Sequence, residues 1–363
     1  MPTTLISPVV VAKEALIVLE NNMVMGNLVH RDYSKEYQQI GATVVVRKPT
    51  SFTATAFTST VGYSTITESS VSVILDKHWD VSFEVTSQEL SLDVVDFSEQ
   101  FLQPAMRAIA QAVDNDICSR SATAISGHYP VSATPAVGDI AGVEAVLDVL
   151  KVPQTQRRLV MHPVTKSAYM ALDAFLNADK RGDGGQALRT AEIGQVLGMQ
   201  TYMDQNIPTF TQVMGVAFAA GTGSITGAWS AAATSGTVTG ATGAVSTVNV
   251  GDCFKVTGYD EWFRVAVAST SSTAGVFVLT SFLPAVITAM TDASVVTFQL
   301  GHRNNLAFHK NAIALVTAPL QPPIGGARAA VATYNGLSIR VVYDYDMQYK
   351  KNRISLDFLC GVK

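Results

Sequence analysis

Residues 96–122 read DFSEQFLQPAMRAIAQAVDNDICSRSA and are predicted to form one long helix. Apolar side chains recur along this stretch at helical spacing, which indicates one buried face. They are Phe97, Phe101, Ala105, Ile109, Ala112 and Val113. Pro104 either kinks this helix or begins its main segment, because proline has no N–H and is tolerated only in a first turn. The remaining elements are predicted on either side of this helix.

A β pattern precedes the helix, from Gly41 to Thr86. Val44–Val46 are strand-like, and apolar residues alternate strictly with polar ones from 79 to 86. Between these strands, residues 49–67 contain no charge and ten Ser or Thr. This segment is either a flexible surface loop or a long hairpin arm that lies on a neighbouring molecule.

The N-terminal residues predict a helix that begins at Ser7-Pro8 and ends near Gly26. Leu16, Ile17, Leu19 and Met23 give it an apolar stripe. Little follows in the sequence for this stripe to pack on. We therefore expect an arm that must dock on some other surface, for example on another subunit.

The segment after the long helix mixes helices and strands. Its predicted elements are helices at 142–150, 163–176 and 186–197, strands at 158–161 and 199–203, and a glycine-rich loop at 180–185. Charge then disappears, because residues 205–251 contain no Lys, Arg, Asp or Glu. Short β-like runs follow at 248–256, 263–268, 276–279 and 295–300. We interpret residues of about 205–301 as an inserted all-β domain; the alternative is disordered low-complexity sequence, mainly at 218–247.

The C-terminal residues return to an alternating pattern. Residues 305–316 return to an apolar pattern, and Asn335-Gly336 is a strong hairpin signal. Strands are predicted at 337–345 and 354–360, with a turn at Lys350-Lys351-Asn352. These strands close the chain.

Charge is scarce in this sequence, with 54 charged residues among 363 where about 91 would be usual. The surface is therefore largely neutral or largely buried against partners. A net charge of −4 argues against a protein whose main task is to grip phosphates. No window holds eighteen consecutive apolar residues, the N-terminus has no basic region typical of a secretory signal, and the three cysteines form no close pair. These features favour a reducing compartment and no membrane partner.

Motifs for catalysis or cofactor binding are missing, including phosphate-binding loops, nucleophile elbows and zinc-protease motifs. Asp344 and Asp346 share one strand face, where a divalent cation would need a third ligand; a solvated face is the simpler interpretation. His302 and His309 lie seven apart, but their surroundings favour a strand over a helical metal site. Cys118, Cys253 and Cys360 are expected to be buried structural residues.

Three other short motifs admit a simple interpretation. The tripeptide Arg181-Gly182-Asp183 resembles an integrin ligand but lies in a predicted loop, and Arg47-Lys48 and Lys350-Lys351 are solvated pairs at strand ends. The sequence thus predicts no catalytic, cofactor-binding or metal-binding residue.

The order of these elements resembles that of the major capsid proteins of tailed phages with the HK97-like fold, in particular the P22-type coat proteins with an inserted β domain. The segments that carry the resemblance are Arg31-Asp32-Tyr33 with Gly41–Val44, Phe101–Met106, Gly198–Tyr202 through Pro208, Asn305–Ala312 and Arg353–Gly361. Each is loose alone, and their order is more specific. The resemblance implies an α+β fold with an N-arm, an E-loop hairpin, a spine helix, peripheral and axial domains, and a barrel-like insert.

The resemblance also implies boundaries and partners. The segments would be 1–35 for the N-terminal arm, 36–90 for the E-loop hairpin and peripheral strands, 91–139 for the spine helix and peripheral domain, 140–207 for the axial domain, 208–302 for the insert and 303–363 for the closing strands. Pentamers and hexamers would form the shell with a scaffolding protein, a portal, non-specifically packaged double-stranded DNA and a decoration protein. Such a protein is assembled in the host cytoplasm, becomes part of the virion and needs no cofactor. The alternatives are a β-rich surface or adhesion protein and an enzyme that uses the Asp344/Asp346 face.

Overall fold

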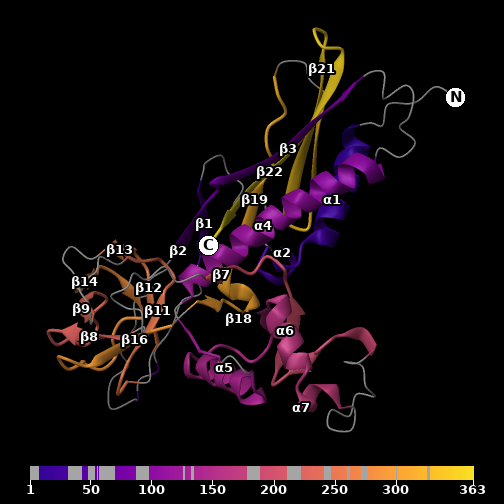
Figure 1. Ribbon diagram of the computed structural model, residues 1–363. Coiled ribbons are helices and arrows are strands. Elements are labelled where there is room, and N and C mark those ends of the chain that lie inside the picture. Colours follow the sequence, from indigo (N-terminus) through magenta and orange to yellow (C-terminus); the bar gives the residue numbers. More distant parts are fainter. Residues whose placement is uncertain are drawn as a thin grey trace. The chain divides into compact units, whose positions relative to one another are not determined.

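The computed structural model of the chain describes residues 8–31, 43–47, 54, 56, 70–86, 98–125, 127–131, 135–177, 189–210, 222–240, 247–259, 262–270, 276–299, 301–324 and 328–363. The chain divides into two compact units. The first consists of residues 1–114 and 311–363, and the second of residues 115–310. Figure 1 shows the elements of both units.

The first unit contains a five-stranded antiparallel sheet. Its strands are β3 (Lys77–Thr86), β19 (Leu315–Ala318), β20 (Arg328–Tyr334), β21 (Leu337–Asp346) and β22 (Lys351–Val362). The closing strand β22 is central. Along one edge it pairs with β3, and along the other edge it pairs first with β21 and then, nearer its C-terminal end, with β19. The two halves of the β pattern seen in the sequence, before and after the long helix, therefore form one sheet.

Period-two alternation gives this sheet one apolar and one polar face. Trp79, Val81, Phe83 and Val85 of β3 lie on the same face as Ile354, Leu356 and Phe358 of β22. The predicted strands at 79–86, 337–345 and 354–360 are confirmed, as is the Asn335-Gly336 hairpin. Both turn residues have positive φ, 48° at Asn335 and 76° at Gly336, which is typical of a two-residue type I′ turn. The turn predicted at 350–352 is placed too late, because β22 already begins at Lys351.

Helices pack on the apolar side of this unit. The N-terminal helix α1 (Pro8–Asn22) contacts β20 and β21 and buries Val11, Ala12, Ala15, Leu16 and Leu19. A short helix α2 (Met25–Leu28) follows it. Helix α1 therefore docks on the sheet of its own chain through Leu16 and Leu19, whereas Ile17 of the predicted stripe is 59% exposed. Docking of the arm on another subunit stays a prediction.

The long helix is confirmed wherever its residues are described. A π-helical turn η2 (Ser98–Leu102) leads into α4 (Gln103–Ala124). Pro104 is the second residue of α4, so it begins the main segment, where its missing N–H is not needed. The Phe101 ring stacks on Phe83 of β3 with 5.7 Å between ring centroids, which joins the start of this helix to the apolar sheet face.

A two-stranded ladder stands beside this sheet, formed by β1 (Thr43–Arg47) and β2 (Ser70–Ile74). Strand β1 confirms the prediction at 44–46. The inner face of the ladder buries Val44 and Val73 against Val316. The charge-free segment 49–67 lies outside the described residues except for positions 54 and 56.

In the second unit, a four-stranded sheet of order β18-β4-β6-β5 packs with helices. Its strands are β4 (Arg157–Met161), β5 (Gln195–Val196), β6 (Met199–Met203) and β18 (Leu306–His309), and the helices are α5 (Val137–Val149), α6 (Pro163–Met170) and α7 (Asp173–Leu176). The predicted strands at 158–161 and 199–203 are confirmed. A 3-10 turn η4 (Lys310–Ala312) leads back to β19 in the first unit.

Three helix predictions need correction. Residues 189–197, within the predicted helix 186–197, are helical only at 189–190 and then form β5. Leu197 and Gly198 have φ of 46° and 76°, so they close a tight β5–β6 hairpin that a helix cannot contain. The helix predicted at 142–150 begins five residues earlier, because the Asp139 carboxylate accepts the N–H of Ala136 at 2.7 Å. The helix at 163–176 is divided into α6 and α7.

The insert is all-β in its described residues. A seven-stranded antiparallel sheet has the order β14-β9-β8-β16-β11-β12-β15. Its strands are β8 (Thr222–Thr226), β9 (Gly236–Gly240), β11 (Cys253–Val256), β12 (Trp262–Val265), β14 (Val276–Leu279), β15 (Phe282–Leu283) and β16 (Val295–Phe298), with β10 (Thr247–Val248) and β13 (Ser269–Thr270) as a separate pair. The low-complexity alternative is therefore wrong at 222–240, where β8 and β9 pair in register.

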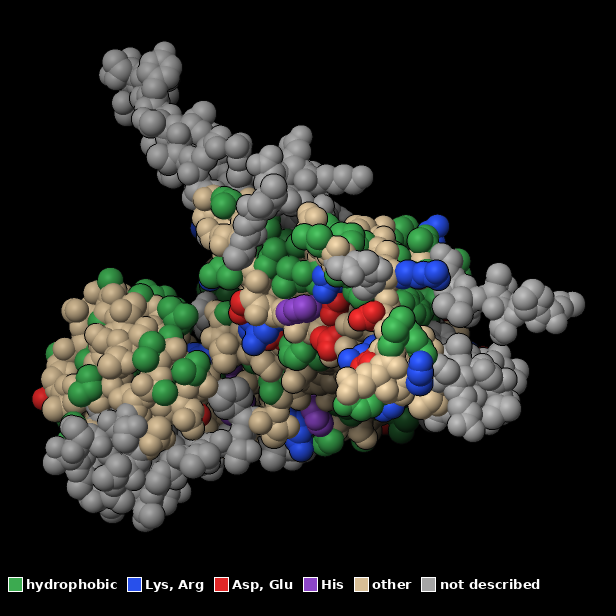
Figure 2. All heavy atoms as spheres, turned by 90° about the horizontal axis from the view of Figure 1, so that it is seen from above, with side chains coloured by type: hydrophobic (Ala, Val, Ile, Leu, Met, Phe, Trp, Pro, Cys, Tyr) green, Lys and Arg blue, Asp and Glu red, His purple; other side chains and the backbone are tan. Residues whose placement is uncertain are grey.

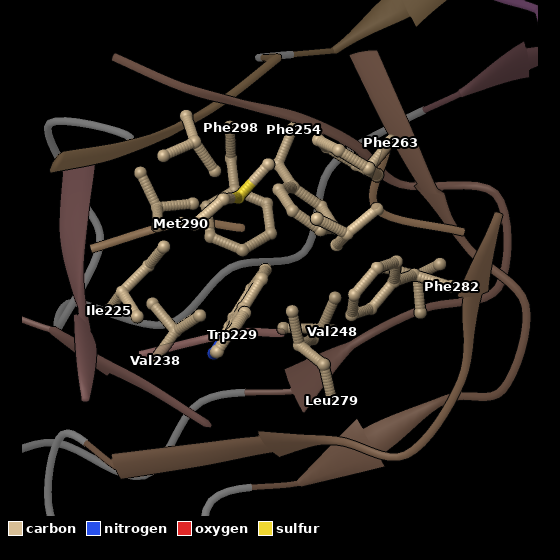
Figure 3. Close-up of a cluster of buried hydrophobic side chains, with 14 residues drawn as sticks. Ile225, Trp229, Val238, Val248, Phe254, Phe263, Leu279, Phe282, Met290 and Phe298 are labelled. Carbon is tan, nitrogen blue, oxygen red and sulfur yellow. The ribbon is translucent and has the colours of Figure 1, made fainter. Parts of the chain in front are cut away.

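One cluster of side chains forms the core of this insert (Figure 3). Trp229 stacks on Phe282 with 5.2 Å between ring centroids, and Phe254 stacks on Phe263 at 5.3 Å. The strands surround this cluster, so the insert has its own apolar core. Its ends meet in a short antiparallel pair, β7 (Thr209–Phe210) with β17 (His302–Arg303).

Candidate assembly surfaces

The outward face of the β1–β2 ladder exposes apolar side chains. Val45 is 46% exposed and Ile74 is 57% exposed, whereas Val44 and Val73 on the other face are buried. The ladder register joins Arg47 to Ser70, so it forms the root of the segment 48–69. An exposed β-branched pair at this root is suited to contact with another molecule.

Gly361 holds this root in place. A Cβ built at Gly361 would lie 2.2 Å from the carbonyl oxygen of Ile74, closer than any side-chain carbon can approach. The end of β2 therefore approaches the backbone of β22 at a position that only a residue without a side chain can occupy.

The turn between β21 and β22 exposes a second apolar group. Tyr345, Met347 and Tyr349 are exposed, Met347 at 76%. The Asp346 carboxylate orders the turn: it accepts the N–H of Gln348 at 2.9 Å and forms an ion pair with Arg353, also at 2.9 Å. Aromatic and methionine side chains are enriched where proteins meet, so this turn, seen at one end of β21 in Figure 1, is a second candidate contact surface.

Ion pairs cover the polar face of the five-stranded sheet. Glu84 accepts hydrogen bonds from Lys351 at 2.8 Å and from Arg353 at 2.9 Å. These hydrogen bonds, that of Lys351 first, lower the pKa of Glu84. The Asp357 carboxylate is buried and accepts from Nε and Nη2 of Arg340 at 2.8 and 2.6 Å. The few charges of this unit thus neutralise one another along the sheet.

Charges are unevenly distributed over the molecule. Residues 205–301 contain six charged side chains, Asp252, Lys255, Asp260, Glu261, Arg264 and Asp292. On the face shown in Figure 2, the described part of the insert is almost entirely uncharged, whereas red and blue side chains are interspersed over other parts of the chain. A surface so neutral can be covered by a partner with little cost of desolvating charge.

The second unit exposes apolar side chains on its helices. Val149 at the end of α5 is 80% exposed, and Leu150, Val164 and Leu176 are also exposed. The end of α5 is fixed by the buried Arg157, whose Nε donates to the carbonyl of Pro153 at 3.0 Å and whose Nη2 donates to Asp148 at 2.5 Å. This apolar end is therefore held rigidly and is a third candidate contact surface.

The structure gives the carboxylates and histidines singled out in the sequence separate places. Asp346 pairs with Arg353 and Asp344 accepts the N–H of Tyr345, so the two carboxylates serve the turn. His302 and His309 lie on separate strands, β17 and β18. Across the described residues, no group of three or more His, Cys, Asp or Glu is placed to hold a metal ion.

The remaining motifs have simple places in the fold. Cys118, Cys253 and Cys360 are buried, as the sequence predicts for structural cysteines. Arg181-Gly182-Asp183 lies outside the described residues. No helix in the described parts of the chain is long and apolar enough to span a bilayer.

Comparison with known proteins gives a match in structure alone. No protein-family model matches the chain, and no curated protein matches its sequence. A solved structure titled "Mycobacterium phage Che8" matches with a TM-score of 0.52 and 14% identity, covering 94% of this chain and 87% of that one. The chain is also similar to "Capsid structure of the Cyanophage P-SCSP1u" (TM-score 0.48, 12% identity, 94% and 84% covered) and to "Capsid of Ralstonia phage GP4" (0.45, 10%, 93% and 82%).

The likeness to the Che8 structure extends over nearly the whole of both chains. At this level of identity it shows a shared fold. That fold is α+β, as the sequence predicts, with helices on one face of an antiparallel sheet and a separate β insert.

Proposed function

We propose that this chain is the major capsid protein of a tailed phage with the HK97-like fold, and that many copies close into an icosahedral shell around packaged double-stranded DNA. The single observation that carries the proposal is the shared fold with the Che8 phage structure over 94% of the chain. The order of arm, hairpin, long helix, mixed segment and closing strands supports it from the sequence. A shell protein needs wide neutral contact surfaces and no catalytic chemistry.

The proposed segment boundaries follow the predicted layout. Residues 1–35 form the N-terminal arm, 36–90 the E-loop hairpin and peripheral strands, 91–139 the spine helix, 140–207 the axial domain, 208–302 the insert and 303–363 the closing strands. In the proposal, pentamers and hexamers assemble with a scaffolding protein and a portal in the host cytoplasm. The neutral insert is the surface on which a decoration protein would bind.

The three exposed apolar groups are the proposed contacts between copies. They are the β1–β2 root at Val45 and Ile74, the turn at Tyr345 to Tyr349, and the α5 end at Val149. Their separation over both units agrees with a subunit that meets several neighbours. In a monomeric enzyme such groups would serve no purpose.

Electron microscopy tests this proposal directly. The purified chain is imaged alone and after co-expression with a scaffolding protein from the same phage. We expect closed, uniform shells in at least one condition. Monomers alone under both conditions, from a protein that is folded by circular dichroism, would contradict the proposal.

A further inference from the structure

A cavity of about 560 Å³ lies in the second unit. Its lining comes from Ile125 just after α4, the loop 127–131, helices α5 and α6, Gln299 and residues 301–307. Apolar side chains such as Val146 and Leu150 form one part of the wall. His128, Arg264, His302 and Asn304 form the polar part.

Arg264, on β12, carries a buried positive charge at this cavity. It is only 5% exposed. Its Nη1 donates to the carbonyl oxygens of Ala122 and, at 2.6 Å, of Ile125, while its Nε has no hydrogen-bond partner. In the described parts of the chain the guanidinium makes no ion pair with a carboxylate. A buried guanidinium without a counter-charge is strongly unfavourable.

Two further residues of the wall carry buried polar atoms that lack hydrogen-bond partners among the described residues. Nε2 of His128 and Nδ2 of Asn304 are buried, and neither has a hydrogen-bond partner among the described residues. Burial first, and then the charge of Arg264, lower the pKa of His128 to about 3, so its ring is neutral at pH 7. The described wall therefore combines two cations, Arg264 and Arg303, with neutral hydrogen-bonding groups, and no carboxylate is among its described residues.

We infer that this cavity binds a small oxyanion, of the carboxylate or phosphate class, with Arg264 as counter-charge and Asn304 and His128 as hydrogen-bonding partners. The anion would satisfy the free N–H of Arg264 Nε and the amide of Asn304, and it would neutralise the buried charge. A metal cation is disfavoured by the guanidinium in the wall. This inference does not depend on the proposed capsid function.

Calorimetric titration of the purified full-length chain tests the inference, with inorganic phosphate in one series and acetate in another. Ionic strength is held constant with sodium chloride at pH 7.5. We expect saturable binding of one anion per chain in at least one series, and the tighter series distinguishes a tetrahedral from a planar ligand. Arg264→Gln should weaken binding at least tenfold.

Two matched variants complete the test. Lys255→Gln removes one positive charge from the same unit outside the cavity wall and should leave the dissociation constant within twofold. Asn304→Asp keeps the side-chain shape, supplies an internal counter-charge and should abolish binding while raising the unfolding temperature. If Arg264→Gln does not fold, Asn304→Asp alone tests whether the anion binds in this cavity. Absence of saturable binding of both anions to the folded wild-type chain, or equal loss in Lys255→Gln, would overturn the inference.

Discussion

The carboxylate of Asp114, on the long helix α4, accepts the backbone N–H of Gly26 at 3.0 Å across 88 residues of sequence. Its other oxygen accepts the N–H of Val24 at 2.7 Å. Both N–H groups belong to the start of the short helix α2, which has no side-chain cap of its own. Asp114 therefore caps α2 from a distance and ties the N-terminal segment to α4.

Removal of this cap should destabilise the first unit. In Asp114→Ala the N–H groups of Val24 and Gly26 lose their acceptors, so we expect the free energy of unfolding to fall by about 2–3 kcal/mol. Asp114→Asn retains one acceptor oxygen and should lose about half as much. Urea denaturation measures both, with Asp116→Ala as the control. Asp116 makes a partly buried pair with Arg120 one turn along the same helix, so its loss should cost about 1 kcal/mol or less; equal losses for Asp114→Ala and Asp116→Ala would contradict this role.

Gly361 should not accept a side chain. Gly361→Ala places Cβ against the carbonyl of Ile74, so β2 must move, and we expect a loss of about 1–3 kcal/mol. Gly138 in α5 is the matched control, because a Cβ there meets no atom within 4 Å. Gly138→Ala should raise stability by about 0.5–1 kcal/mol through helix propensity. Thermal unfolding of the two variants should shift in opposite directions; a shift in the same direction would show that the close approach to β2 is not required.

Acid should weaken the second unit through His128. Its folded pKa of about 3 lies below the ordinary value of 6.5, because burial and the nearby Arg264 and His302 disfavour the charged ring. The unfolded state therefore takes up a proton first as pH falls below 6.5. The stability that depends on a neutral His128 ring is fully present above pH 6.5. It is lost from there down to about pH 3, at up to about 1.4 kcal/mol per pH unit.

The control for this pH dependence is His128→Phe, which cannot titrate. Denaturation curves at pH 7, 6, 5 and 4 should show a shallower decline of stability in this variant than in the wild type. Parallel declines would show that groups other than His128 carry the acid sensitivity.

The root of the hairpin should matter for assembly and not for folding. Val45→Glu places a charge on the exposed face of β1, where it would be desolvated in an interface between copies. We expect unchanged circular dichroism and a large loss of shells in micrographs of the co-expressed protein. Val45→Thr keeps the β-branched shape and neutrality and should assemble normally; normal shells from Val45→Glu would exclude this face as a contact.

Strands with strict alternation were predictable from the sequence. The pattern at 79–86 and at 337–345 specifies both the strand and its inner face, because a slip of one residue would expose Phe83 and bury Glu84. The Asn335-Gly336 turn was equally clear, since few other residue pairs adopt two successive positive φ values. Local chemistry determines these elements.

Elements that depend on distant contacts were not predictable in the same way. The apolar spacing at 186–197 suggested a helix, yet Gly198 and the pairing of β5 with β6 impose a hairpin there. The apolar stripe of α1 had no visible partner in the nearby sequence. Its partners are β20 and β21, which follow some three hundred residues later. Arg264 gave no signal at all, because its neighbours are apolar and the cavity forms from segments far apart in sequence.

The pairing of β7 with β17 has a consequence for the history of this protein. Since Phe210 pairs with His302 in one antiparallel ladder, the chain enters and leaves the insert at neighbouring positions of the second unit. A two-residue turn could bridge these positions, because such turns join neighbouring antiparallel strands. The β insert, with its own core, is thus a module that evolution can add, lose or exchange, and a chain with residues 211–301 replaced by Asn-Gly would retain the register of every other strand.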